Sequence, residues 1–287
     1  MMRILIGYNG SDAATAALLD LRRAGFPDDT EALILSVAEF WQPPQSSAEA
    51  EATANAGKNI LCREFPTWTV RAETATGSPP REILARSESF KPDVIVVGER
   101  PHMHGAGDIF MGQTSQTILT EAGCSVRIAR GSDSEKPGAA RLLVGFDGSA
   151  GALHSVEAIT ARKWPAGSMV KLLAIADSSV LNSIGRFTPQ MKDASVEARL
   201  ASQWAETLAG GSLEDLKNAG LKASVEVRFG HPREMIIEEA DHWNTDSIFV
   251  GPHCAPNSFE RYLIGSVSSG VAARANCTVE AVRKWVR

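Results

Sequence analysis

Short apolar runs alternate along the chain with longer segments whose apolar residues recur at helical spacing. In one clear example, the apolar run Leu142–Phe146 ends at a polar turn, and apolar residues then recur with helical periodicity as far as Ile159. Ser149 stands between the two, where its hydroxyl can cap the first turn of a helix. The runs therefore predict buried strands, and the periodic segments predict the helices that join them.

The same alternation continues to the end of the chain. It predicts strands at residues 170–176, 225–229, 247–250 and 278–282, and helices at 193–208, 232–242 and 265–275. The dipeptide Gly210-Gly211 predicts a helix break, after which Ser212 resembles the start of a new helix. Strands that are almost wholly apolar and separated by helices are typical of a parallel sheet with both faces covered. The expected fold class is therefore α/β.

The second half of the chain repeats the first. The segment RILIGYNGS at residues 3–11 matches RLLVGFDGS at 141–149, with five of nine positions identical and an offset of 138 residues. Later matches, such as Gly98 with Gly251 and Gly112 with Gly265, have an offset of 153, so the second half carries an insert of 15 residues. We expect two domains, at residues 1–131 and 140–287, joined by a polar linker at 132–139.

Composition narrows the range of partners. The 287 residues carry a formal net charge of −5 and are 44% hydrophobic, as folded globular domains usually are. The acidic balance argues against nucleic acid as an electrostatic partner, and no apolar stretch reaches the ~18 residues of a membrane span. The first residues lack the features of an export signal, and the four cysteines form no C-x-x-C motif. We expect a cytoplasmic protein in which Cys124 and Cys277 serve core packing.

The loops beyond the carboxyl ends of the strands are the candidate sites, because ligands bind there in parallel α/β sheets. Asp147 follows the first strand of the second half. A carboxylate at a strand tip can accept a hydrogen bond from an amino group such as that of adenine; the alternative is a residue that only forms the turn. Gly265 and the serines after it open a helix. This pattern predicts a phosphate cradle made of amides and hydroxyls, and the alternative is an ordinary helix cap.

Four short motifs, taken in order, resemble the universal stress protein family. They are Asp147-Gly-Ser, Gly230-His-Pro-Arg-Glu, Gly265-Ser-Val-Ser and Cys277-Thr-Val. Counterparts occur in the first half, so the resemblance spans nearly the whole chain twice. It implies two doubly wound, five-stranded parallel-sheet domains of the Rossmann-like type found in adenine-nucleotide alpha hydrolases. It also implies a stress-response protein that binds ATP or ADP, with Mg²⁺ on the phosphates, as a sensor or regulator.

The resemblance assigns roles most completely in the second copy. Asp147 would contact adenine, the backbone of Ile175 would bracket the base, and Gly251 would let the ribose and phosphates approach closely. The phosphate oxygens would meet the amides of Gly265, Ser266 and Val267 and the hydroxyls of Ser266 and Ser268. Cys254 stands at the second glycine of the family signature G-x2-G-x9-G-[ST], with ten residues rather than nine before Gly265. It adds a side chain where the family has none.

The corresponding positions of the first copy depart further from the family pattern. They are Asn9, Val37, Gly98, Gly112, Thr114 and Ser115. Asn9 lacks the charge of Asp147, so a charge-assisted hydrogen bond is lost. Pro101 replaces the second signature glycine, and Glu99 and Asp108 stand where they would repel phosphates. We expect the first site to be degenerate.

The family also implies how the copies associate, because its members commonly dimerise through their last strand. By resemblance, we expect residues 126–129 to pair with residues 279–282 inside one chain, as a pseudo-dimer. Whether two chains associate further as a homodimer is left open.

Other chemistries have little support in the motifs. The chain has no P-loop, no dinucleotide fingerprint and no nucleophile elbow, and no catalytic base stands out, so we expect at most slow ATP hydrolysis. Zinc favours ligands such as His102, His104, His253 and Cys254, but His-x-His in a loop is more often a solvated pair, and we expect no metal site. In a second functional hypothesis, the pockets are vestigial and the protein is a non-nucleotide interaction scaffold.

Overall fold

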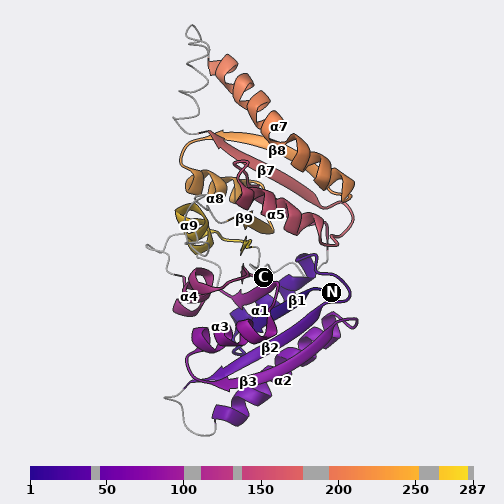
Figure 1. Ribbon diagram of the computed structural model, residues 1–287, viewed down its shortest axis with the longest axis vertical. Coiled ribbons are helices and arrows are strands. Elements are labelled where there is room, and N and C mark those ends of the chain that lie inside the picture. Colours follow the sequence, from indigo (N-terminus) through magenta and orange to yellow (C-terminus); the bar gives the residue numbers. More distant parts are fainter. Residues whose placement is uncertain (40–45, 100–110, 132–137, 177–193, 252–264, 284–287) are drawn as a thin grey trace.

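The two halves of the chain form one continuous ten-stranded sheet in the computed structural model (Figure 1). The structure describes residues 1–39, 46–99, 111–131, 138–176, 194–251 and 265–283. The strand order is β3-β2-β1-β4-β5-β10-β9-β6-β7-β8, so each half contributes five neighbouring strands. Neighbouring strands run parallel within each half, whereas β5 and β10 run antiparallel where the halves meet. The predicted fold class, two doubly wound parallel-sheet domains, is confirmed.

The first copy alternates strands and helices. Its strands are β1 (Arg3–Gly7), β2 (Glu31–Ala38), β3 (Thr69–Thr76), β4 (Val94–Gly98) and β5 (Ser125–Ala129). Its helices are α1 (Asp12–Asp20), α2 (Ser46–Glu64), α3 (Pro79–Phe90) and α4 (Gln113–Glu121), with a 3-10 turn at Leu21–Arg23 after α1. The central strands are almost wholly buried, as expected when helices cover both faces of a parallel sheet.

The second copy repeats this order of elements. Its strands are β6 (Arg141–Gly145), β7 (Met169–Ala176), β8 (Lys222–Phe229), β9 (Ser247–Val250) and β10 (Thr278–Ala281). Its helices are α5 (Ala150–Thr160), α7 (Ala194–Asn218), α8 (Pro232–His242) and α9 (Ser266–Arg274). These bounds agree with the sequence prediction to within a few residues, with one exception in α7.

The exception is the predicted break at Gly210-Gly211, which is wrong. Helix α7 runs unbroken from Ala194 to Asn218. Glycine in a helix interior costs roughly 1 kcal/mol relative to alanine, so the local signal does favour a break. However, Ala209 and Leu216, on either side of the pair, are fully buried in the core beneath the helix. Packing of this face therefore outweighs the local preference.

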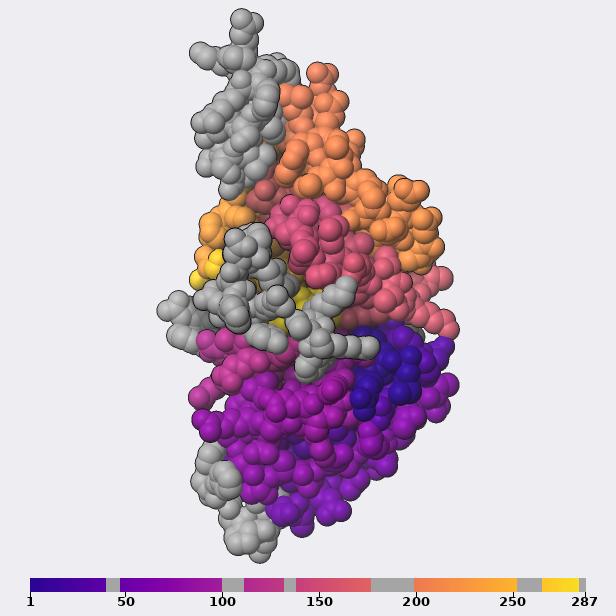
Figure 2. Space-filling view, in the orientation of Figure 1, coloured from indigo at the N-terminus to yellow at the C-terminus, as the bar shows by residue number. Residues whose placement is uncertain are grey.

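Helices cover both faces of the sheet (Figure 1). On one face, α3, α4, α8 and α9 enclose a single apolar core that continues across the junction between the copies. On the other face, α1 and α2 enclose a core in the first copy, and α5 and α7 enclose a separate core in the second. Figure 2 shows the two copies as adjoining lobes. Because one core is shared, the junction is part of the fold and not a loose contact between domains.

Strands β5 and β10 join the copies, which confirms the pairing that the family resemblance implied. Val126 lies opposite Ala281, Arg127 opposite Glu280, and Ile128 opposite Val279. Since the repeat offset here is 153 residues, residue 127 of the first copy corresponds to residue 280 of the second. The pair of Arg127 and Glu280 therefore lies on the pseudo-twofold axis that relates the two copies.

Two equivalent arginines reinforce the pseudo-twofold symmetry. The guanidinium of Arg130 donates to the carbonyl oxygens of Ala272 and Cys277. In the equivalent contact, the guanidinium of Arg283 donates to the carbonyl oxygens of Leu119 and Ala122. Each copy thus supplies a cation to the C-terminal end of the last helix in the other copy, where carbonyl groups lack helical partners and the helix dipole is negative.

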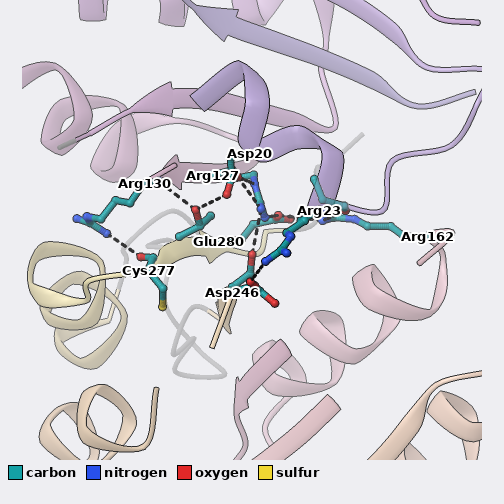
Figure 3. A network of polar contacts seen from close by, with 11 residues as sticks. Asp20, Arg23, Arg127, Arg130, Arg162, Asp246, Cys277 and Glu280 are labelled. Carbon is teal, nitrogen blue, oxygen red and sulfur yellow. Dashed lines mark hydrogen bonds and ion pairs between the residues drawn. The ribbon is translucent and has the colours of Figure 1, made fainter. Parts of the chain in front are cut away.

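The side chains of Arg127 and Glu280 at the axis are fully buried, and Figure 3 shows them among their polar contacts. Arg127 donates from Nη2 to Asp20 Oδ2 at 2.8 Å and from Nη1 to Glu280 Oε2 at 3.2 Å. Glu280 also accepts from Arg162 Nη1 at 2.9 Å. Burial alone would raise the pKa of Glu280, but Arg162 and Arg127 outweigh burial and lower this pKa. Arg127 and Glu280 therefore pair with each other across the two copies, and each has a second partner of opposite sign in its own copy, Asp20 for Arg127 and Arg162 for Glu280.

Candidate functional site

A cavity of about 420 Å³ opens at the carboxyl ends of β1, β2 and β4 in the first copy. Parallel α/β sheets bind their ligands at this edge. Of the six positions predicted for the first site, five line the cavity: Asn9, Val37, Gly98, Thr114 and Ser115. The sixth, Gly112, is the N-cap residue of α4. The structure therefore brings the predicted first-copy residues together around one hollow.

The residues at the tips of the first strands have the same geometry in both copies. Asn9 Oδ1 accepts a hydrogen bond from the Ser11 amide at 3.1 Å, and Asp147 Oδ1 accepts one from the Ser149 amide at 2.9 Å. Both serines cap the helix that follows, as predicted for Ser149. In each tip residue, Oδ1 thus accepts a hydrogen bond from the backbone of the turn, and the side chain is exposed at the sheet edge.

Two glycines at this edge are required for packing inside the protein. A Cβ atom at Gly251 would lie 2.2 Å from the carbonyl carbon of Gly151 at the start of α5. Likewise, a Cβ atom at Gly98 would lie 2.6 Å from the carbonyl oxygen of Ala13 in α1. Strands β4 and β9 approach these helices too closely for any side chain. This contact explains both glycines without the close ligand approach that the family resemblance implied.

The start of α9 is the predicted anion seat of the second copy. Gly265 is its N-cap residue, so no side chain caps the helix from that position. Ser266 is exposed and Val267 is half-buried. Ser268 is buried, and its hydroxyl donates to the carbonyl oxygen of Gly251 at 2.7 Å. The Ser268 hydroxyl is therefore directed into the protein, where it ties α9 to the end of β9, and not toward a phosphate as predicted.

The start of α4, the equivalent position in the first copy, is bonded to a carboxylate. The Gly112 amide donates to Glu99 Oε2 at 3.0 Å. Glu99 follows β4 directly and is held by its own amide, which donates to the Ala129 carbonyl oxygen at 2.9 Å. A negative group here is favoured by the free amides and the positive end of the helix dipole. Glu99, which the sequence placed near the phosphate position, thus occupies the anion seat itself.

Sequence reasoning missed four polar residues that line the first-copy cavity. They are Ser36, Glu39, Glu49 and Thr53. Glu49 and Thr53 lie one helical turn apart on α2, a spacing that places them on one side of the helix. This spacing is a usable signal, but it has meaning only once α2 is known to border the strand ends.

The two cysteines packed against the shared core, Cys124 and Cys277, are not poised for chemistry. Cys124 is fully buried and Cys277 is half-buried against the same core. Burial raises the pKa of each thiol to about 12. Because the thiolate is the reactive form, both groups are inert near neutral pH, in line with the predicted packing role.

Several predicted positions lie outside the described residues. They are Cys254, Pro101, His102, His104, Asp108 and His253. Ile175, by contrast, is described: it lies in β7, half-buried, in register with Arg228 of β8. Within the described ranges, the structure shows no group of three or more His, Cys, Asp or Glu residues that could hold a metal ion. None of the helices in the same part of the chain could cross a bilayer.

Comparison with known proteins adds to this geometry. The family model described as the universal stress protein family matches residues 1–130 and again residues 139–283. A Staphylococcus aureus (strain USA300) protein named as a universal stress protein is 27% identical over 144 residues, which cover 50% of this chain and 82% of that protein.

Solved structures of similar fold cover nearly the whole chain. A universal stress protein from Archaeoglobus fulgidus superposes with a TM-score of 0.66 at 18% identity, over 98% of each chain. A Pseudomonas aeruginosa protein named as a universal stress protein gives a TM-score of 0.61 at 13% identity, over 99% of this chain and 93% of the other. At these identities the likeness concerns the fold, including its arrangement as two copies in one chain.

Proposed function

Because the chain belongs to the universal stress protein family, we propose that it is a stress-response protein that binds ATP or ADP. Binding takes place mainly in the second copy, at the carboxyl ends of β6 and β9. The protein acts as a sensor or regulator and not as a turnover enzyme.

The observation that carries this proposal is the contrast between the starts of α9 and α4. In the second copy, glycine at the N-cap and the exposed Ser266 after it leave the first amides of α9 without a capping carboxylate among the described residues. In the first copy, Glu99 fills the corresponding position. A helix N-terminus with unpaired amides attracts phosphate, so the second copy is the better seat for a nucleotide.

The other end of the nucleotide would lie beside Asp147. Its carboxylate is exposed at the tip of β6, and carboxylate oxygens accept hydrogen bonds from amino groups such as that of adenine. Mg²⁺ keeps several of its waters and binds nucleotides through their phosphates. The start of α9 would therefore hold the phosphates, and the ion would be bound to these phosphates.

The proposed role as a sensor rests on the chemistry of the side chains. The Cys124 and Cys277 thiols have a pKa of about 12, so neither can serve as a nucleophile. We infer that ATP hydrolysis is slow at most. The acidic net charge of −5 argues against nucleic acid as the partner and leaves a small-molecule nucleotide. The proposed location is the cytoplasm, and the proposed working unit is the pseudo-dimer inside one chain.

Calorimetric titration of the full chain with ATP and Mg²⁺ tests the proposal. The variant Asp147→Ala, Ser266→Ala removes the adenine and phosphate contacts of the second copy, and we expect it to lose binding while it stays folded. The matched control is Asn9→Ala, Gln113→Ala, which changes the equivalent positions of the first copy and should bind ATP as the wild type does. Unchanged affinity in the second-copy variant would overturn the proposal.

Native mass spectrometry of the protein as purified separates this function from that of a scaffold. A co-purifying adenine nucleotide supports the proposal. An apo spectrum, together with no thermal shift in millimolar ATP, favours the non-nucleotide interaction scaffold instead.

A further inference from the structure

The cavity of the first copy is lined by acidic and neutral groups. Among its described lining residues, Glu39 at the end of β2 and Glu49 on α2 are carboxylates, and none is a lysine, arginine or histidine. Phosphate groups brought among these carboxylates would be repelled, and the repulsion is stronger where protein replaces water. The cavity therefore favours a ligand that carries no negative charge.

Glu99 adds a second, independent obstacle to phosphate. Its Oε2 atom accepts from the Gly112 amide at 3.0 Å, so the anion seat at the start of α4 is filled by a group that belongs to the protein. A ligand phosphate could bind at the start of α4 only by displacing the Glu99 carboxylate, and Glu99 is the residue that directly follows β4. Displacement would leave that carboxylate beside the phosphate, which is a like-charge contact.

The second copy does not share this feature. Residue 252 corresponds to residue 99 at the repeat offset of 153, and it is a proline. Proline has no carboxylate to place at the helix start. The two copies therefore differ at the same part of a ligand: in the first, Glu99 supplies an anion, and in the second, no carboxylate among the described residues bonds to the start of α9.

The remaining lining suits a neutral polar molecule. The hydroxyl-bearing residues Ser36, Thr53 and Thr114 line the cavity together with Asn9 and the two glutamates. Asn9 uses Oδ1 in its turn, so its amino group can donate to a ring nitrogen, while carboxylates accept from hydroxyl groups. The apolar walls include Leu35, Ile83 and Val97. A volume of about 420 Å³ is typical of small-molecule pockets.

We propose that the first copy binds an uncharged nucleoside, for which adenosine is the probe, and that Glu99 excludes its phosphorylated forms. The inference rests on the proposed function, because the preference for adenine is taken from it. It adds that the two copies of one chain bind different forms of one ligand, with the nucleoside in the first copy and the nucleotide in the second.

Calorimetric titration of the full chain with adenosine and with AMP tests this inference. The titrations are made in the Asp147→Ala, Ser266→Ala background, which silences the second copy. We expect adenosine to bind at least about tenfold more tightly than AMP, and Glu99→Gln to reduce that preference by about tenfold. The glutamine oxygen can still accept from the Gly112 amide, so this variant changes charge and not shape. Glu121→Gln, an exposed change at the other end of α4, is the matched control and should leave the preference unchanged.

A cavity-filling variant locates the binding site. Thr53→Trp places a large side chain in the first-copy cavity, and we expect it to abolish adenosine binding without affecting ATP binding in the second copy. Three results would each overturn the inference: AMP binding as tightly as adenosine, an unchanged preference in Glu99→Gln, or adenosine binding that survives Thr53→Trp. Failure of the proposed function is a separate result. It would be seen as ATP affinity that is the same in Asp147→Ala, Ser266→Ala as in the wild type.

Discussion

Removal of the Glu280 charge tests whether the buried ion network stabilises the junction of the two copies. In Glu280→Gln, the side chain keeps its shape, but Arg127 and Arg162 lose a fully buried carboxylate. Loss of one partner from a buried ion pair costs about 3–5 kcal/mol, because the remaining charge stays buried without compensation. Asp20 still pairs with Arg127. We therefore expect a loss at the lower end of this range, about 3 kcal/mol in the free energy of unfolding.

Differential scanning calorimetry measures this loss directly. At about 2 °C per kcal/mol for a chain of this size, the midpoint of thermal unfolding should fall by roughly 6 °C. Glu206→Gln, an exposed change of the same chemistry on α7, is the matched control and should stay within about 0.5 kcal/mol of the wild type. A Glu280→Gln midpoint within 1 °C of wild type, at the approximate scale above, would refute the reasoning that the network stabilises the junction.

Charge exchange at the axis tests the network further. In the double variant Arg127→Glu, Glu280→Arg, the two axial residues still form an opposite-charge pair. However, the new glutamate faces Asp20 and the new arginine faces Arg162, so each meets a like charge. We expect the exchanged variant to be less stable than Glu280→Gln. Recovery of wild-type stability would show instead that the axial pair acts alone.

Three further predictions concern stability. Since Arg162 and Arg127 lower the pKa of Glu280 below its usual value of 4.5 against the effect of burial, its contribution is present above about pH 4.5 and is lost as pH falls through the lowered pKa. The difference in urea-unfolding free energy between wild type and Glu280→Gln should shrink below that pH. Gly251→Ala should cost about 1–3 kcal/mol in the same assay, because its Cβ would overlap the backbone of Gly151. Gly138→Ala, whose Cβ would meet only Arg23 Nη2 at 3.8 Å, an ordinary contact distance, should be neutral. Gly210→Ala should stabilise the protein by roughly 0.5–1 kcal/mol, since it lies inside α7 and, apart from the helix's own nearby backbone, no atom lies within 4 Å of the added Cβ. A loss of stability would contradict the continuous helix.

The strands and most helices could be predicted from the sequence because each is specified by local pattern. The apolar run at residues 142–146 and the cap at Ser149 required no knowledge of distant residues. The wrong prediction at Gly210-Gly211 has the opposite cause. There the local signal favours a break, and only contacts of Ala209 and Leu216 with the sheet, which are remote in sequence, restore the helix.

In the candidate site, too, the residues set by local pattern could be predicted, and those set by contacts remote in sequence could not. Asn9, Gly98 and Thr114 were found because they follow strands or open a helix, and such positions are visible in the repeat. Glu49 and Thr53 could not be found, because their approach to the cavity depends on how α2 lies across the sheet. Glu99 was recognised as a source of repulsion, but its hydrogen bond to Gly112 depends on the path of the chain between them, which residue types alone do not specify.

The differences between the two copies have a common physical consequence. Two identical copies paired through β5 and β10 would place identical side chains opposite each other on the axis, either two arginines or two glutamates, buried and of like charge. The first copy has arginine and the second has glutamate, so the first copy pairs favourably with the second and unfavourably with another first copy. A second difference of this kind lies at the repeated position 99/252, where the first copy has a glutamate bonded to the start of α4 and the second has a proline. In each case the two copies carry different residues at one repeated position. At the axis this difference makes the two copies complementary in charge, and at position 99/252 it gives them different groups beside the ligand site.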